Sequence, residues 1–490
     1  MSDLDFFHGR LEYMVDMRQP LAVLATRMPW GLVEQRLAPL LTRPVRTGRH
    51  AVVQDLFGTS EQVSAPGVSA AGRPRLPIRL MASLLYLKHA YGLSDEEVTA
   101  RWSQDVVFQF FSGQVYFENR VPCDASLLSR FRSAVGEAGV EELLAVTITT
   151  AANLGAVKPA DFERVTVDTT VQEKAVAYPN DSRLLELARK KVVRQAKREG
   201  IALKQTYDKE GKTLVRRAAG YAHARQFNRL KRVIARQQTI LGVLLREIER
   251  KMDGSGQEPS EAFERLLELA WRIQQQKRGD KAKDKVLSLH APEVECIGKG
   301  KARQPYEFGV KAGIVTSHTK GLIVGARTFP NNPFDGHTLA QQLEQTGILL
   351  QDLQVQPKTV IVDLGYRGVD HDNPNVRIIH RGKIKGLSKT ERRWLKRRQA
   401  IEPVIGHLKE DHGMRRNWLK GQLGDALNAV LCAAGFNLQW LLRAIARLGL
   451  KALWQFFYAL IQPAPQSRLH SWNRPAFVFN PTNALRWVSA

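Results

Sequence analysis

Cysteine is scarce in this chain, which has three among its 490 residues: Cys123, Cys296 and Cys432. They lie far apart and form no Cys-x-x-Cys pair, so neither a disulfide framework nor a cysteine zinc site is expected. The N-terminal sequence MSDLDFFHGR lacks the basic start and the apolar run of a signal peptide. Both absences favour a protein of the reducing cytoplasm.

A long uninterrupted apolar run is also missing. A membrane-spanning helix needs about 20 consecutive, predominantly apolar residues. The most apolar stretch, residues 426–460, therefore predicts buried helices, and no membrane partner is expected. The residues that interrupt it are Asn428, Asn437, Gln439, Arg443, Arg447 and Lys451.

Acidic residues are few beside basic ones: 48 Asp and Glu stand against 73 Lys and Arg, for a net charge of +25. Residues 183–236 carry 17 Lys and Arg against 4 Asp and Glu, and residues 381–420 carry 13 against 4. Such clusters favour a surface that binds a polyanion, with nucleic acid ahead of an anionic membrane surface. The hydrophobic content of 43% supports packed cores and excludes global disorder.

Helical patterns dominate residues 77–144, after a Ser-, Gly- and Pro-rich stretch at residues 59–74 that is typical of a linker. Ser94 and Glu97 form a capping box for a helix expected over residues 94–113. Three helices with short connections form a unit large enough to bind DNA. Dimerisation and bracing of the core are the alternatives.

The third of these helices has Asp124 as a suitable N-cap. Gly136 and Gly139 are expected near its end, because glycine commonly terminates helices.

Residues 163–171, ERVTVDTTV, alternate with the period of two that predicts a β-strand. Val165 and Val167 point to one face, and Asp168 points to the other. Aspartate is depleted in strands. Asp168 therefore indicates either a metal ligand or a solvated strand face.

A basic helical insertion is expected over residues 181–285. Part of it mixes a Leu and Ile stripe with arginines, as in a helical hairpin or short coiled coil with a cationic outer face. Phosphates are the expected ligand of that face, and a solvated charged face is the alternative. Residues 306–316 and 321–329, joined by the turn SHTK, then predict a β-hairpin.

The run KTVIV leads directly into Asp363 and a glycine-containing turn. This pattern predicts a buried central strand with a carboxylate at its tip. Open α/β sheets bind ligands at that edge. A last strand is expected over residues 376–380.

Residues 392–420 combine strong positive charge with an amphipathic pattern. Arg398, Glu402 and Lys409 fall on one helical stripe beside an apolar seam. Because Pro403 disfavours helix at the residue before it, the helix either kinks at Glu402 or begins anew at Pro403. The alternative is an ordinary basic, amphipathic helix in which the single acid Glu402 only reduces the net positive charge.

Asp168, Asp363 and Glu402 are thus three carboxylates carried by a mixed sheet flanked by helices. Oxygen ligands suit Mg²⁺, and two such ions can serve phosphodiester chemistry by activating one oxygen and stabilising another. Other acids fit less well, because they lie outside the strand pattern or off the helical stripe; these are Asp161, Asp181, Glu410 and Asp411. Asp335 and His337, in FDGHTL, indicate either residues near the site or a turn and a helix cap, and the turn and cap are the favoured interpretation.

The order of these motifs resembles the DDE transposases of bacterial insertion sequences, and specifically their IS-five group. The matching phrases are VTVDTT, YEFGVKAGI, FDGHTL, DLGYRG and AIEPVIGHLKEDHGMRRNWLKG. The superfamily pattern Tyr-x2-Arg-x3-Glu-x6-Lys matches at Arg398, Glu402 and Lys409, while Leu395 stands at the tyrosine position. The resemblance covers residues 75–435.

The resemblance implies an α+β protein with an RNase H-like core. The expected domains are a helical, DNA-binding one (1–155), the catalytic core (156–180 and 286–425), the basic insertion (181–285), and C-terminal helices with a proline-rich tail (426–490).

The resemblance also implies that Asp168, Asp363 and Glu402 hold two Mg²⁺ ions, with Mn²⁺ as a substitute. Water would cut at the element's ends, and the released 3′-OH would attack target DNA. Arg398 and Lys409 would contact phosphates near the scissile bond. The N-terminal helices would read the terminal inverted repeats, and a homodimer or larger assembly is expected on double-stranded DNA. The alternatives are a nuclease that cuts without joining and a catalytically degenerate DNA-binding protein.

Overall fold

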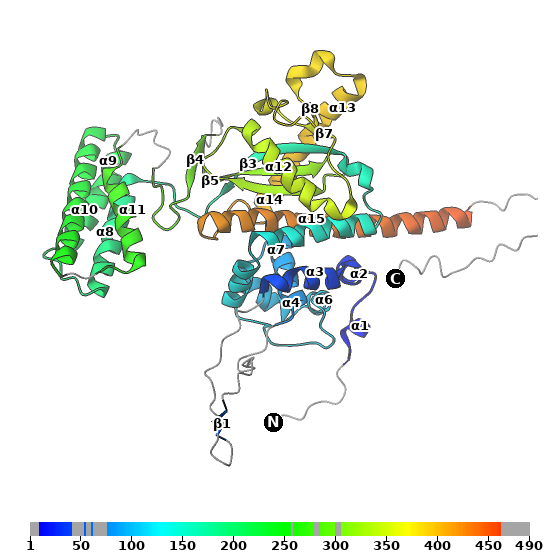
Figure 1. Cartoon of the computed structure of the whole chain (residues 1–490), viewed down its shortest axis with the longest axis horizontal. Coiled ribbons are helices and arrows are strands. Elements are labelled where there is room, and N and C mark those ends of the chain that lie inside the picture. The colour runs from blue at the N-terminus through cyan, green and yellow to red at the C-terminus, as the bar shows by residue number, and fades with distance from the viewer. Residues whose placement is uncertain are drawn as a thin grey trace, which may run out of the picture. The chain divides into compact units, whose positions relative to one another are not determined.

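The computed structural model describes residues 9–41, 53–54, 60–61, 76–255, 258–277, 285–298 and 305–461. The chain divides into two units, Met1–Ile445 and Ala446–Ala490. The first unit holds every element up to the middle of α15 (Gly421–Ile461), including the sheet (Figure 1). The proline-rich tail expected at the C-terminus lies outside the described residues, as does nearly all of the linker expected at residues 59–74.

The N-terminal region is helical, as predicted. Ser94 and Glu97 form the predicted capping box, with hydrogen bonds in both directions. The helix expected over residues 94–113 is two helices, because Asp105 caps a second one with its own carboxylate. The elements are α1 (Leu11–Met14), α2 (Pro20–Arg27), α3 (Trp30–Leu37), η1 (Pro39–Leu41), the paired β1 (Val53–Gln54) and β2 (Ser60–Glu61), α4 (Ile78–Ala90), α5 (Asp95–Trp102), α6 (Val106–Phe111) and α7 (Ala125–Asn153).

Helix α7 is longer than its glycines predict. Gly136 adopts φ 62°, a conformation that favours glycine, and produces a kink within the helix instead of its end. The helix then continues because Leu143, Leu144 and Ile148 are fully buried, so an apolar face extends well past the kink.

The sheet has the strand order β4-β5-β3-β7-β8, and β6 pairs with β5 on the same edge as β4. Strands β5 and β6 form the predicted antiparallel hairpin, and β7 runs parallel to β3. The bounds are η2 (Pro159–Phe162), β3 (Arg164–Glu173), β4 (Glu295–Gly298), β5 (Tyr306–Ser317), β6 (Ile323–Phe329), α12 (Asp335–Leu349), η3 (Gln351–Leu353), β7 (Thr359–Ile361), η4 (Leu364–Tyr366), β8 (Arg377–Ile379), η5 (Arg381–Gly386), α13 (Lys389–Arg397), η6 (Arg398–Ala400) and α14 (Ile401–Glu410).

One hydrophobic core joins the N-terminal helices to the sheet. It runs from Leu21 through α4 and α7 to strands β3, β5, β6 and β7 and to α15. Buried Asn437 of α15 links the layers: its side chain donates to Thr147 of α7 and to the carbonyl of Ile323 in β6, and it accepts from the Ile323 amide. The N-terminal helices therefore brace the sheet directly.

Helix α4 approaches α15 so closely that the contact requires glycine. A Cβ on Gly435 would stand 2.5 Å from the carbonyl carbon of His89. His89 and His412 are both buried, and Nδ1 of each lies within hydrogen-bonding range of the other's carbonyl oxygen, at 3.4 and 2.8 Å. These contacts join α4 to the turn that follows α14.

Helix α15 contains the one stretch in the described part of the chain that is long and apolar enough to cross a membrane, Gly421–Gly449. However, 72% of its apolar window is buried inside the protein. That burial is typical of a core helix and agrees with the prediction of buried helices.

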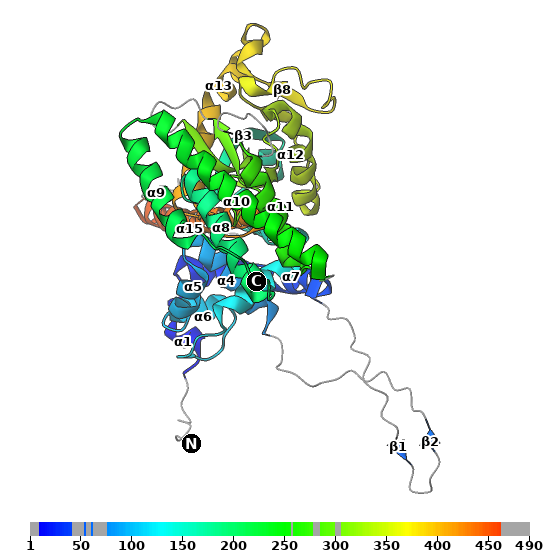
Figure 2. The same cartoon turned by 90° about the vertical axis from the view of Figure 1, so that its left-hand side faces the viewer.

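The insertion is built differently. Its four helices are α8 (Asp181–Arg198), α9 (Asp208–His223), α10 (Phe227–Ser255) and α11 (Glu261–Gln275), and they lie side by side (Figures 1 and 2). Leu185, Leu245, Phe263 and their neighbours form a hydrophobic core that α8, α10 and α11 share with Val286 and Leu289, and a smaller cluster lies between α9 and α10. The insertion therefore folds around apolar residues of its own.

Together these elements confirm the predicted fold class, a mixed α+β protein with a helical N-terminal region and an RNase H-like core. The predicted domain boundaries stay a prediction.

Candidate active site

Strand register brings the first two predicted carboxylates together. Strand β3 pairs in parallel with β7, so that Thr166 stands opposite Ile361. Asp168 and Asp363 each lie two residues beyond this pair. Neighbouring strands are about 4.8 Å apart, and residues two apart along a strand share a face. Asp363 follows the end of β7, and its charge acts on Asp168, so the two carboxylates lie near each other at this end of the sheet.

The environment of Asp168 disfavours its charge. Burial is the largest effect and raises the pKa of its carboxyl to about 6, and the neighbouring charge of Asp363 acts in the same direction. Arg398 and the Thr169 amide oppose this rise by favouring the carboxylate. Coupled, partly buried carboxylates of this kind are typical of functional sites.

Glu402 belongs to a new helix. Helix α13 ends at Arg397, the 3₁₀ turn η6 follows, and α14 begins at Ile401. Pro403 therefore lies in the first turn of α14, where its missing N–H breaks no helical hydrogen bond. Of the two predicted alternatives, a kink at Glu402 or a new helix at Pro403, the structure shows a new helix, which begins at Ile401, two residues before the proline.

Arg398 connects the third carboxylate to the first. Its Nη1 lies 3.1 Å from Oδ2 of Asp168, and its Nη2 lies 3.9 Å from Oε1 of Glu402. The Glu402 side chain is 64% exposed, whereas that of Asp168 is 18% exposed. The Arg398 guanidinium thus lies between a largely buried carboxylate, Asp168, and an exposed one, Glu402.

The neighbouring residue holds this segment in place. Arg397 donates from Nε to the carbonyl of His318, at 3.0 Å, and from Nη2 to that of Thr319, at 2.7 Å. Both acceptors belong to the turn that follows β5. Because η6 is fixed there, Arg398 reaches Asp168 from a defined position.

Lys409 lies further along α14, in acidic surroundings. Its Nζ is 3.2 Å from Glu307 and 3.9 Å from Glu173, on strands β5 and β3. Its side chain is only 15% exposed. The structure thus gives Lys409 two carboxylate partners that the helical stripe did not indicate, and its predicted contact with DNA stays a prediction.

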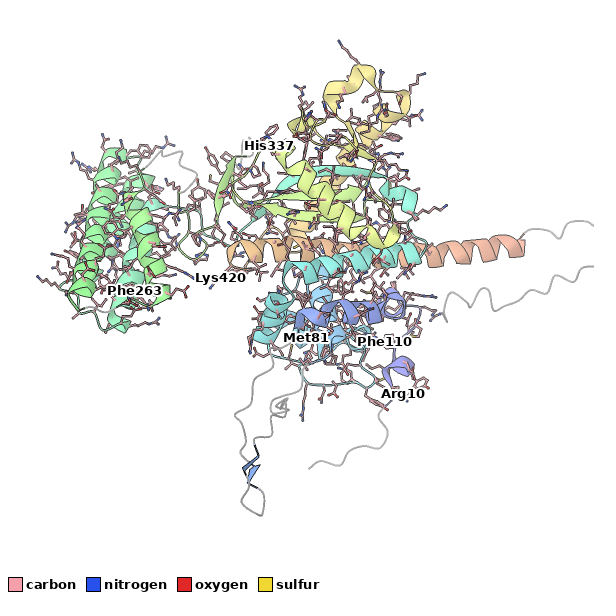
Figure 3. All side chains as sticks on the ribbon, in the orientation of Figure 1. Arg10, Met81, Phe110, Phe263, His337 and Lys420 are labelled. Atoms are coloured by element: carbon pink, nitrogen blue, oxygen red, sulfur yellow. The ribbon has the colours of Figure 1, made fainter. Side chains whose placement is uncertain are left out.

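A fourth acid, Asp335, lies beside the predicted pair. It begins α12, as the favoured interpretation of FDGHTL predicted, and it also lies near Asp363, as the alternative allowed. His337, labelled in Figure 3, packs its ring against Phe334. Oδ1 of Asp335 accepts from Thr169 Oγ1 at 2.9 Å and from Lys311 Nζ at 2.8 Å. Asp335 is thus tied to the residue that follows Asp168.

The turn after Asp363 completes these surroundings. A Cβ on Gly365 would stand 3.0 Å from carboxylate oxygens of both Asp335 and Asp363, so the two acids flank this glycine. Asp363 accepts from the Gly365 amide at 2.8 Å. Tyr366 is fully buried, and burial raises its pKa, as do the nearby charges of Asp335 and Asp168.

The competing acids have other partners. Asp161 caps η2 and accepts from Thr319, and Asp181 pairs with Lys285. Glu410 pairs with Arg415, and Asp411 pairs with His407.

The carboxylates suit a divalent cation in chemistry but are not fully assembled. Asp168, Asp363 and Glu402 offer oxygen donors alone, the set that Mg²⁺ and Mn²⁺ prefer. Among the described residues, no three Asp, Glu, His or Cys side chains stand close enough together to hold an ion as they are. Glu402 is exposed on the first turn of α14, and the Arg398 guanidinium lies between it and Asp168.

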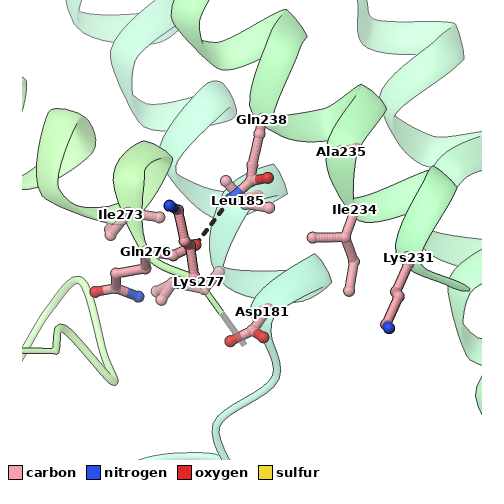
Figure 4. Close-up of a pocket in the computed structure, with 10 residues that line it drawn as sticks. Asp181, Leu185, Lys231, Ile234, Ala235, Gln238, Ile273, Gln276 and Lys277 are labelled. Carbon is pink, nitrogen blue, oxygen red and sulfur yellow. Dashed lines mark hydrogen bonds between the residues drawn. The ribbon is translucent and has the colours of Figure 1, made fainter. Parts of the chain in front are cut away.

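A separate hollow lies in the insertion, among α8, α10 and α11 (Figure 4). Leu185, Ile234 and Ile273 line it, and Gln238 donates to the carbonyl of Gln276 across it at 2.8 Å. Its lining includes Asp181 but none of the acids Asp168, Asp335, Asp363 and Glu402.

Comparison with known proteins agrees with this arrangement. A family model described as "Transposase domain (DUF772)" matches residues 9–134, and one described as "Transposase DDE domain" matches residues 270–438. A Rhizobium meliloti protein described as "Uncharacterized protein ORF8 in nfe locus" is 40% identical over 223 residues, which are 46% of this chain and 95% of that protein. No solved structure matches the chain.

The fold and the two domain matches define the class of protein, an enzyme that acts on DNA. Within that class, the chain belongs to the DDE transposases of insertion sequences, and its function is that of a transposase. The predicted resemblance to this family is therefore confirmed.

Proposed function

We propose that this transposase binds the terminal inverted repeats of its element, cleaves DNA there in a metal-dependent reaction, and transfers the released end into target DNA. The observation that carries the proposal is the placement of Asp168 on β3 beside Asp363, which follows the end of the parallel strand β7, with Glu402 joined to Asp168 through Arg398. The five matching phrases support membership of the IS-five group.

Each acid has a distinct part in this proposal. Asp168 and Asp363 hold the divalent ions from the sheet, and Glu402 completes the site from α14. Two Mg²⁺ ions, or Mn²⁺ in their place, supply activation of the attacking oxygen and stabilisation of the leaving one. Because Asp168 has a raised pKa, its carboxyl must lose a proton before it can serve as a ligand.

The two predicted cations, Arg398 and Lys409, differ in how well they are placed to bind a phosphate. Arg398 is held beside both carboxylates, so its guanidinium stands where a scissile phosphate would bind, and its planar fork suits phosphate oxygens. Lys409 is balanced by Glu173 and Glu307, so we assign it a weaker contact on the same DNA strand.

Strand transfer joins two ends, so we expect a dimer or larger assembly on double-stranded DNA. The scarcity of cysteine supports a cytoplasmic location for this reaction.

The test uses purified protein, DNA that carries the element's own ends, and Mg²⁺. The parent should nick and join those ends, and Asp363→Asn should bind them with the same affinity but do neither. A variant that cuts as well as the parent would show that Asp363 is not part of the site.

One observation favours a second candidate, a DNA-binding protein without catalysis: Glu402 is exposed, and no complete ligand cluster is assembled in the described residues. Binding without cleavage by the parent would identify that protein. Cleavage without joining would identify a nuclease.

A further inference from the structure

The insertion carries cations that the proposed catalytic site does not use. Along α9, Glu210, Arg217 and Tyr221 are spaced by seven and four residues, so they share one edge of the helix. The adjacent side of α9 is fixed inward, because Leu214 and Ala218 are buried against α10. The shared edge therefore lies beside the boundary between α9 and α10.

Helix α10 presents a matching edge. Arg229, Arg232 and Arg236 are spaced by three and four residues and lie on one side of the helix. Two contacts show that the edges meet: Arg236 Nε donates to Glu210 Oε1 at 2.7 Å, and the Arg229 guanidinium lies 5.9 Å from the centre of the Tyr221 ring. We call the line formed by Arg217, Arg229, Arg232 and Arg236 the arginine seam.

The charge of the arginine seam is largely unbalanced. All four arginines are exposed. Arg236 is paired with Glu210, while Arg217, Arg229 and Arg232 form no ion pair with any acid in the part of the chain that the structure describes. Like charges held in a row repel one another, and an anion that binds across them relieves the repulsion.

The geometry of the seam suits a polymer of phosphates. Arg229, Arg232 and Arg236 extend over about 10 Å of helix at 1.5 Å per residue. This length spans about three phosphates of one DNA strand, which follow one another every 3.4 Å along the axis. Guanidinium groups bind phosphate oxygens in pairs of hydrogen bonds, and these contacts carry no sequence information.

We propose that the arginine seam binds the phosphate backbone of duplex DNA, independently of sequence and outside the catalytic site. The inference requires only that DNA is the partner, as the family match shows, and it does not depend on the proposed chemistry.

The test measures the affinity of the full chain for short DNA duplexes over a series of salt concentrations, without divalent metal. One duplex carries the element's end and the other has a random sequence. The seam variant combines Arg217→Gln, Arg229→Gln and Arg232→Gln. Its control combines Arg246→Gln and Arg250→Gln and so removes two charges against three; these are exposed arginines of α10 that lie about 20 Å or more beyond Arg232 at 1.5 Å per residue.

The slope of log affinity against log salt should become shallower by about 3 in the seam variant, because each phosphate that an arginine neutralises adds roughly 0.9 to the slope. The change should be the same on both duplexes, and the control should keep the parent's slope. An unchanged slope in the seam variant would overturn the proposal, as would an equal change in the control. Folding of each variant is checked by circular dichroism.

A further readout separates this inference from the proposed function. At saturating protein and with Mg²⁺, the seam variant should still nick the element's end, because the carboxylates are intact. If the parent itself fails to nick, the proposed chemistry is wrong, but the salt slopes still decide whether the seam binds DNA.

Discussion

The N-terminal helices and the inserted helices are both all-helical, yet they relate to the sheet in opposite ways. Helices α4 and α7 share one continuous core with the strands, and Asn437 and the tight contact at Gly435 join them to α15. Helices α8 to α11 close around apolar residues of their own. Similar secondary structure therefore serves two purposes, a brace in one region and an attached module in the other.

This difference decides how far a mutation acts. A residue in the shared core supports the strands that carry Asp168 and Asp363, so damage there should reach the active site. A residue in the core of the insertion supports only a surface, so damage there should alter DNA binding and leave the carboxylates in place. Four predictions test this contrast.

Deletion gives the largest expected effect. Replacing residues 181–285 with a short linker should leave a folded protein, because residues 177–180 and 287–290 line one hollow and so lie close together. Removing residues 1–155 should leave no folded protein, because the apolar face of the sheet and the apolar face of α15 would be exposed. Soluble yield and circular dichroism measure both. A soluble, folded chain without residues 1–155 would contradict the shared core.

Substitutions that create one cavity in each hydrophobic core should distinguish the N-terminal helices from the insertion. Leu144→Ala in α7 and Leu245→Ala in α10 each empty a fully buried site and should cost about 2–5 kcal/mol of local stability. Leu144→Ala should lower the main unfolding transition and DNA cleavage together. Leu245→Ala should lower only the stability of the insertion. Calorimetry and the nicking assay provide the comparison, and an equal drop in cleavage in both variants would argue against independent cores.

The contact at Gly435 offers a smaller test with a control in the same helix. Gly435→Ala places a methyl group 2.5 Å from the carbonyl carbon of His89 and should cost about 1–3 kcal/mol. Gly449→Ala meets no atom within 4 Å and should be neutral or stabilising by up to about 1 kcal/mol. Chemical denaturation measures the difference. A neutral Gly435→Ala would show that α4 does not press on α15.

The pH dependence of metal binding should be the smallest effect. Because burial raises the pKa of Asp168 to about 6, a proton competes with the metal below that pH. Apparent Mn²⁺ affinity should fall about tenfold per pH unit below 6 and level off above it. In the metal-free protein the raised pKa of Asp168 also stabilises the folded state. This stabilisation is fully present below about pH 3.8, the ordinary pKa of the group, and is lost as the pH rises through about 6.

The chain without residues 181–285 should show the same profile, because the insertion does not contribute to the surroundings of Asp168. Calorimetric titration at several pH values measures the profile. An affinity that stays flat between pH 5 and 7 would mean that Asp168 is not a ligand.

Local patterns in the sequence predict the elements that carry the acids. The alternation around Asp168 and the apolar run before Asp363 each depend on neighbours within a few residues, and strand register then places the two side by side. Pro403 narrows the start of α14 to two alternatives, because it restricts only its own vicinity. These features are local, so sequence suffices for them.

Other features depend on distant residues, and sequence patterns could not decide between the alternatives for them. Asp335 fits a helix start equally well without any partner, and its place in the site depends on Lys311 and Thr169, which are 24 and 166 positions away. Lys409 has a helical spacing that suits a free cation, but strands β3 and β5 bring it two acids. The kink at Gly136 persists within α7 because of burial beyond it.

The most direct measurement of the central claim is the affinity of the parent and four variants for Mn²⁺, determined by calorimetry and by electron paramagnetic resonance. Asp168→Asn, Asp363→Asn and Glu402→Gln should each weaken binding by about tenfold or more, because each removes a ligand. Asp335→Asn should bind nearly as well as the parent, because Lys311 and Thr169 already engage that carboxylate. Undiminished binding by Glu402→Gln, with weakened binding by Asp335→Asn, would contradict the assignment and make Asp335 the third ligand.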